Sequence, residues 1–132
     1  MQSVLKSMKE YLKLAANDYE CRMDLIKGLI EHNALFEVVK QLRIIKGMRL
    51  SYISKISLKR DLYFNDGDYV VSGLYKNSRI GIGYLKIDGF PDMLEAYINI
   101  SDISGAVKLK NGQRIKAVVG LNGFGLYVIN IL

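Results

Sequence analysis

Short segments separated by turn signals dominate the second half of this 132-residue chain. Hydrophobic side chains recur at every second position in the clearest of them, which is the pattern of a strand with one buried face. Five such segments in about 65 residues, with no helix between most of them, predict a small β-barrel. The predicted strands span residues 69–75, 80–87, 94–100, 114–119 and 126–131.

The second and third predicted strands each have two unlike faces. One face carries glycine and aliphatic residues and suits a core. The other carries two rings, an amide, a cation and an isoleucine, which are Ile82, Tyr84, Lys86, Tyr97 and Asn99. Aromatic side chains on a sheet, flanked by cations, commonly hold single-stranded nucleic acid by base stacking. We therefore expect a stacking platform on this face.

The first half of the chain predicts helices. Residues 3–31 form one amphipathic pattern, since stripe positions recur at alternating spacings of three and four. Asn17, Asp18 and Gly28 are weak points where this helix can bend or divide. The stripe suits packing within its own domain or a seam with a second copy or another protein. Its members are Leu5, Met8, Leu12, Ala15, Tyr19, Arg22, Ile26 and Leu29, and Arg22 interrupts it.

A second helix is expected from an N-cap at Asn33 to about residue 45, with Gly47 ending it. Joined through residues 31–33, the two helices would form an antiparallel hairpin. Residues 48–62 fit a strand or a short helix, and the helix would create a helix-turn-helix. The turn signal at residues 65–68 marks a boundary. The chain is thus predicted to be α+β, with a mainly helical region over 1–66 and a barrel over 67–132.

Charge favours an anionic partner without requiring one. The net charge is +6 and the isoelectric point is about 9.4, which fits a polyanion partner but also fits many proteins that bind none. Residues 40–60 contain seven Lys or Arg and no acid. This run is either a solvated face or a phosphate-facing patch. The residues that we expect to contact phosphate within it are Lys46, Arg49 and Lys55.

Several function classes have little support. A single cysteine, Cys21, excludes an internal disulfide, and no apolar run approaches the ~18 residues of a membrane span. With no cleavable leader in the pattern, we expect a cytoplasmic protein. His32 has no nucleophile pattern beside it, so we expect no enzyme and no cofactor. The acidic residues of 88–95 fit a solvated turn better than a divalent metal site.

The strand motifs resemble those of the cold-shock domain, a five-stranded antiparallel OB-type barrel that binds single-stranded RNA or DNA. The first ribonucleoprotein motif of that family, Lys-Gly-Phe-Gly-Phe-Ile, corresponds to residues 80–85, and the second, Val-Phe-Val-His-Phe, to residues 96–100. The family's Trp-Phe-Asn falls on residues 75–77, and its Gly-Gln pair on residues 112–113. The resemblance covers residues 69–132. The same segment is similar to the cold-shock-like modules of RNase II/R-type exoribonucleases.

This resemblance implies a non-catalytic protein that binds single strands, with RNA somewhat favoured over DNA. The residues that it places in contact with nucleic acid are Tyr75, Lys76, Arg79, Ile82, Tyr84, Lys86, Tyr97 and Asn99. Two motif phenylalanines are replaced by Ile82 and Ile100, and the motif histidine by Asn99. These replacements motivate a second hypothesis, in which the barrel or the helical stripe binds another protein as an adaptor or regulator.

Overall fold

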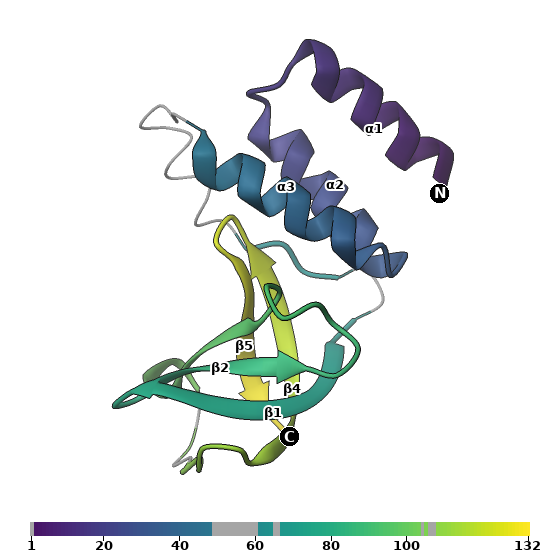
Figure 1. Ribbon diagram of the computed structural model, residues 1–132. Helices are drawn as coiled ribbons and strands as arrows, with labels where there is room; N and C mark the ends of the chain where they lie inside the picture. The colour runs from purple at the N-terminus through teal and green to yellow at the C-terminus, as the bar shows by residue number, and fades with distance from the viewer. Residues whose placement is uncertain (1, 49–60, 65–66, 104, 106–107) are drawn as a thin grey trace. The chain divides into compact units, whose positions relative to one another are not determined.

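A computed structural model describes residues 2–48, 61–64, 67–103, 105 and 108–132 of the chain. It contains helices in the amino-terminal part and strands in the carboxy-terminal part, so the α+β class is confirmed (Figure 1). The chain divides into two compact units. The first comprises residues 1–60 with 122–124, and the second comprises residues 61–121 with 125–132.

The first unit contains α1 (Gln2–Leu14), α2 (Tyr19–Glu31) and α3 (Leu35–Gly47). The helix expected over 3–31 is divided into α1 and α2 at Asn17 and Asp18, one of the weak points that the sequence marked. Asp18 caps α2 by accepting a hydrogen bond from the Cys21 amide at 3.1 Å. Its carboxylate also accepts one from the Tyr11 hydroxyl at 2.8 Å. Both bonds stabilise the carboxylate, and they lower the pKa of Asp18.

Asn33 ends a helix instead of starting one. Its φ is +60°, and the N-cap of α3 is Ala34, which makes no side-chain capping bond. The Ala34 amide donates to the Leu29 carbonyl at 2.8 Å, and the Asn33 amide donates to the Ile30 carbonyl at 3.0 Å. This is the Schellman pattern of a helix C-terminus, and asparagine tolerates its left-handed position better than most residues. The predicted N-cap at Asn33 was therefore wrong.

The helical stripe packs mainly inside its own unit. Leu12, Ile26 and Leu29 are buried there with residues of α3 such as Val38. Arg22, the interruption in the stripe, is also buried, and burial lowers its pKa. Its guanidinium donates to the Gln41 side chain at 2.6 Å and to the Ala16 carbonyl at 2.9 Å. A buried arginine needs such partners to offset its desolvation.

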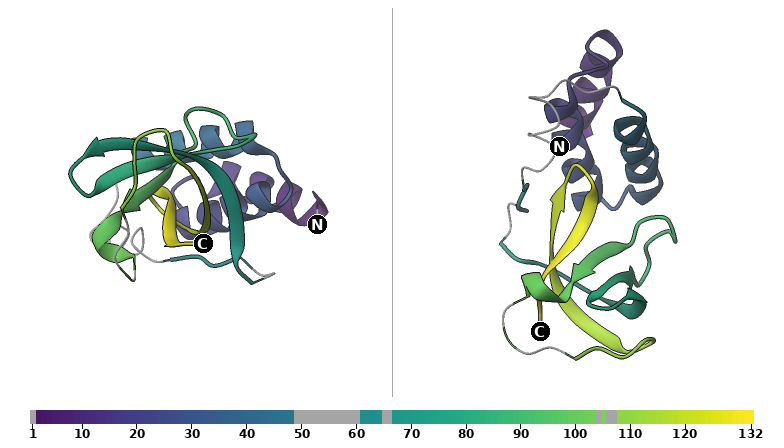
Figure 2. Two further views of the ribbon diagram at one scale, coloured as in Figure 1. Left: turned by 90° about the horizontal axis from the view of Figure 1, so that it is seen from below. Right: turned by 90° about the vertical axis from the view of Figure 1, so that its left-hand side faces the viewer.

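The second unit is a closed barrel of five strands in the order β1-β2-β3-β5-β4 (Figures 1 and 2). The strands are β1 (Tyr69–Arg79), β2 (Ile82–Ile87), β3 (Ala96–Asn99), β4 (Arg114–Asn122) and β5 (Gly125–Ile131). β1 pairs antiparallel with both β2 and β4, and β2 pairs antiparallel with β3. β3 pairs parallel with β5. The five-stranded barrel is confirmed, but the prediction that it is wholly antiparallel was wrong.

Each strand differs at one or both ends from its predicted bounds, and two of these differences matter for the site. Residues 76–78, which separate the first two predicted strands, lie inside β1, and the chain reverses at Ile80 and Gly81 instead. Gly81 has a φ of +75°, which favours glycine, and a register shift between Asn77 and Arg79 precedes it. β3 ends early because the Asn99 side chain accepts hydrogen bonds from the Ser101 amide and hydroxyl. These bonds cap a single 3₁₀ turn over Ile100–Asp102.

Tyr75 fills the barrel interior beside a glycine on the neighbouring strand. The Tyr75 side chain is only 2% exposed. A Cβ atom added at Gly83 would lie 2.7 Å from Cε1 of Tyr75 and would also clash with the Lys76 carbonyl oxygen. Glycine at position 83 thus makes the room that the buried ring occupies.

We predict that Gly83→Ala destabilises the barrel by about 1–3 kcal/mol, because the added methyl group overpacks the core against the Tyr75 ring and the backbone. Urea unfolding followed by circular dichroism measures this change. Gly47→Ala is the control, since a Cβ there meets nothing within 4 Å. Equal unfolding midpoints for the two variants would contradict the proposed packing.

Candidate functional site

The outward face of β2 and β3 carries the residues that the sequence placed there. Burial alternates along both strands, with Tyr84, Lys86 and Tyr97 exposed and Ile82 and Asn99 half-buried. Tyr84 lies directly opposite Tyr97, and Ile82 lies directly opposite Asn99. The predicted face assignment is therefore confirmed for these five residues. We call this surface the β2–β3 face.

The two tyrosines of this face form a cross-strand pair. Their ring centroids are 6.0 Å apart with an interplanar angle of 70°, which is an edge-to-face arrangement. Tyr84 is 40% exposed and Tyr97 is 36% exposed. Such a pair gains favourable energy from the ring quadrupoles and restricts the rotamers of both side chains. The β2–β3 face thus presents exposed aromatic surface on two tyrosines whose rings pack against each other.

Tyr75 does not belong to this surface. It points into the barrel together with Val71, and its hydroxyl donates to the Asn77 side chain at 3.3 Å. The prediction that Tyr75 stacks a base was wrong, because the strand alternation places it on the core side. Lys76, the next residue, points outward opposite Tyr84.

Carboxylates from the β2–β3 loop pair with the cations of the barrel. Lys76 contacts Glu95 at 3.2 Å, and Lys86 contacts Asp92 at 3.2 Å. Arg114 of β4 contacts Asp88 at 2.6 Å. The acidic residues of this loop are thus spread over three cations, and the residues that the structure describes contain no group of three metal-ligating side chains. A phosphate approaching Lys76 or Lys86 competes with a carboxylate for the ammonium group.

The positive charge of the chain is unevenly distributed. Residues 61–132 contain seven Lys or Arg and seven Asp or Glu, so this segment has no formal net charge. Residues 1–60 contain twelve Lys or Arg and six Asp or Glu, so they carry the whole positive net charge of the chain. Arg79 and Lys46 are exposed, each in a different unit. The predicted contacts Arg49 and Lys55 lie outside the described residues.

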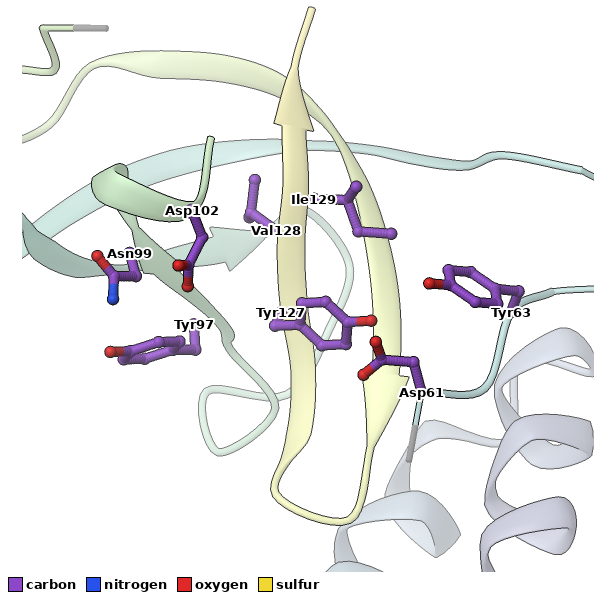
Figure 3. Close-up of a pocket in the computed structure, with 8 residues that line it drawn as sticks. All are labelled: Asp61, Tyr63, Tyr97, Asn99, Asp102, Tyr127, Val128 and Ile129. Atoms are coloured by element: carbon purple, nitrogen blue, oxygen red, sulfur yellow. The ribbon is translucent and has the colours of Figure 1, made fainter. Parts of the chain in front are cut away.

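A groove lies between β3 and β5, and no pattern in the sequence indicated it. It has a volume of about 280 Å³ (Figure 3). Three tyrosines and two carboxylates line it with an amide and two aliphatic residues, and these are Tyr63, Tyr97, Tyr127, Asp61, Asp102, Asn99, Val128 and Ile129. We call this the β3–β5 groove. Its residues come from three parts of the sequence, and only the barrel topology brings them together.

Tyr127 is a half-buried phenol in this groove. Burial of the side chain is the main cause that raises the pKa of Tyr127, and a hydrogen bond with the neighbouring Asp61 carboxylate raises it further. The ring also covers Gly120, where a Cβ atom would lie 2.8 Å from the Tyr127 hydroxyl oxygen. Tyr127 is therefore a neutral hydrogen-bond donor to Asp61 at physiological pH.

His32 and Cys21 both belong to the helical unit. His32 is exposed at the C-cap of α2. Cys21 is half-buried, and burial raises the pKa of its thiol. None of the described helices is both long enough and apolar enough to cross a membrane.

Comparison of the chain with protein-family models, with curated proteins and with solved structures returned no match. The cold-shock resemblance therefore depends on the strand motifs alone.

The environment of Tyr127 predicts a specific alkaline loss of stability. Its pKa is raised in the folded state, so the unfolded chain loses this proton first, near pH 10. The contribution of the raised Tyr127 pKa to the free energy of unfolding is fully present below pH 10. It declines above pH 10, by at most about 1.4 kcal/mol per pH unit. Urea unfolding between pH 10 and 11 should show a shallower decline for Tyr127→Phe. Asp61→Asn keeps the buried phenol, so its slope should fall only partly, and identical slopes for all three proteins would contradict this assignment.

Proposed function

We propose that the barrel binds single-stranded nucleic acid on the β2–β3 face without catalysing a reaction. The observation that carries this proposal is the exposed cross-strand pair of Tyr84 and Tyr97. Aromatic rings on a barrel face bind bases of any sequence, because every base has a π-face. The motif resemblance to cold-shock barrels supports the same assignment and favours RNA over DNA.

Each residue of the face has a role in this proposal. Tyr84 and Tyr97 stack bases, and Ile82 provides apolar contact beside them. The Asn99 oxygen is already used by Ser101, so its amide nitrogen donates to a base edge. Lys76, Lys86 and Arg79 contact phosphates through their positive charge, and Lys46 adds positive charge from the helical unit.

A protein partner is the second candidate, in which the barrel serves an adaptor or regulator. Zero formal charge over residues 61–132 and the pairing of Lys76 and Lys86 with carboxylates favour it. Pull-down from lysate with and without nuclease separates the two candidates. A partner that survives nuclease, together with no oligonucleotide binding, would support the adaptor.

We expect Tyr84→Ala with Tyr97→Ala to weaken binding of a labelled single strand at least tenfold, because a stacked ring contributes about 1–3 kcal/mol per base. Fluorescence anisotropy with RNA and DNA oligonucleotides measures the affinity and the preference. The matched control is Tyr84→Phe with Tyr97→Phe, which keeps both rings and should bind almost as well as the unmodified chain. If the alanine double variant binds as tightly as the phenylalanine double variant, the proposal that Tyr84 and Tyr97 stack bases is contradicted.

We also predict that Asp92→Asn with Glu95→Gln strengthens single-strand binding several-fold at low salt. Neutral loop side chains free Lys86 and Lys76 for phosphate, and each new contact should steepen the plot of log affinity against log salt by about 0.7. Anisotropy titrations at several salt concentrations measure both effects.

Asp24→Asn with Glu31→Gln is the control for these loop variants, because it changes the net charge equally at exposed positions of α2. An equal gain from the control pair would show that net charge alone acts, and that the loop does not compete with phosphate.

A further inference from the structure

We propose that the β3–β5 groove binds the guanidinium group of an arginine side chain from a partner polypeptide. This inference goes beyond nucleic-acid binding and does not depend on it. It rests on the shape of the groove, on its aromatic walls and on its charge.

The groove exists because of how the barrel closes. β2 and β3 pair over four residue positions, whereas β3 and β5 are in register at one position only, Tyr97 opposite Tyr127. β3 stops at Asn99, and the chain turns away through Ile100–Asp102. Where the two strands diverge, the side chains leave a space of about 280 Å³ on the outside of the barrel.

Tyrosine rings line this space. Tyr97 and Tyr127 stand on adjacent strands, and Tyr63 lines the groove from the segment before β1 (Figure 3). The faces of aromatic rings attract cations. A guanidinium group is planar and weakly hydrated, so it stacks on such rings better than a lysine ammonium does.

The described residues that line the groove carry only negative charge. Asp61 and Asp102 are the charged side chains among them, and they lie on either side of the Tyr127 ring in Figure 3. The Asp61 carboxylate already accepts from Tyr127. The exposed Asp102 side chain makes no hydrogen bond or ion pair with any residue that the structure describes. A carboxylate beside aromatic rings is an arrangement that can receive the planar donor fork of arginine.

Other occupants fit less well. Two carboxylates repel phosphate, so the groove is not an extension of a nucleic-acid path. Among the described residues no third acidic, histidine or cysteine side chain joins them to hold a metal ion. The groove shares Tyr97 and Asn99 with the β2–β3 face. An arginine stacked on the Tyr97 ring therefore changes the surface on which a base would stack.

Nuclear magnetic resonance of the full ¹⁵N-labelled chain tests the proposal with N-acetyl-argininamide as the probe. The matched ligand is N-acetyl-citrullinamide, which has nearly the same shape and no charge. We expect saturable shifts of the Tyr97, Asp102 and Tyr127 amides with the arginine probe, and at least tenfold weaker binding of the citrulline probe.

Asp102→Asn should weaken binding of the arginine probe about fivefold or more, because a neutral amide replaces a negatively charged carboxylate in the groove. Asp68→Asn removes one exposed charge outside the groove and should leave the affinity unchanged. Spectra of both variants without probe verify that the fold is kept. Equal binding of the two probes, shifts centred on the 88–95 loop, or an unaffected Asp102→Asn variant would each overturn the proposal.

Discussion

The contact between the buried Tyr75 ring and Gly83 underlies the arrangement of the outer barrel surface. With the ring inside, strand alternation places Lys76 outside, and the pairing of β1 with β2 sets Lys76 opposite Tyr84. The pairing of β2 with β3 then sets Tyr84 opposite Tyr97. A one-residue slip in either ladder would exchange the two faces. The exposed tyrosine pair is thus a consequence of core packing on the strand beside it.

Tyr97 links the two candidate sites of the barrel. On its antiparallel side it meets Tyr84, and on its parallel side it stands opposite Tyr127. The antiparallel side gives a continuous paired surface, whereas the parallel side opens into a groove with two carboxylates. One strand of four residues therefore borders a face with cations and a groove whose described lining residues include no cation. Such a strand suits competition between ligands of opposite charge.

The features that the sequence predicted well are local ones. Alternation along β2 and β3 gave the correct outward residues because strand period is a property of neighbouring residues. Tyr75 was misplaced because its parity follows from the ladder with β2, and the register shift after Asn77 moved the expected turn. Asn33 suits both a helix start and a helix end, and only the hydrogen bonds from the following residues decide between them. The β3–β5 groove needs the closed topology, which no local pattern contains.

The aromatic pair and the excess positive charge lie in different parts of the chain, and they suit different kinds of binding energy, namely base stacking and contacts with phosphate. The Tyr84–Tyr97 pair lies in a segment with no formal net charge, whereas the whole positive excess lies in residues 1–60. Stacking on rings depends little on salt, but contacts between cations and phosphates weaken steeply as salt rises. Because Lys76 and Lys86 already have carboxylate partners, they supply less counterion release than free lysines would. In the proposed binding of a single strand, stacking therefore supplies most of the affinity of the barrel, and any strong salt dependence of the full chain is expected to originate in its first 60 residues.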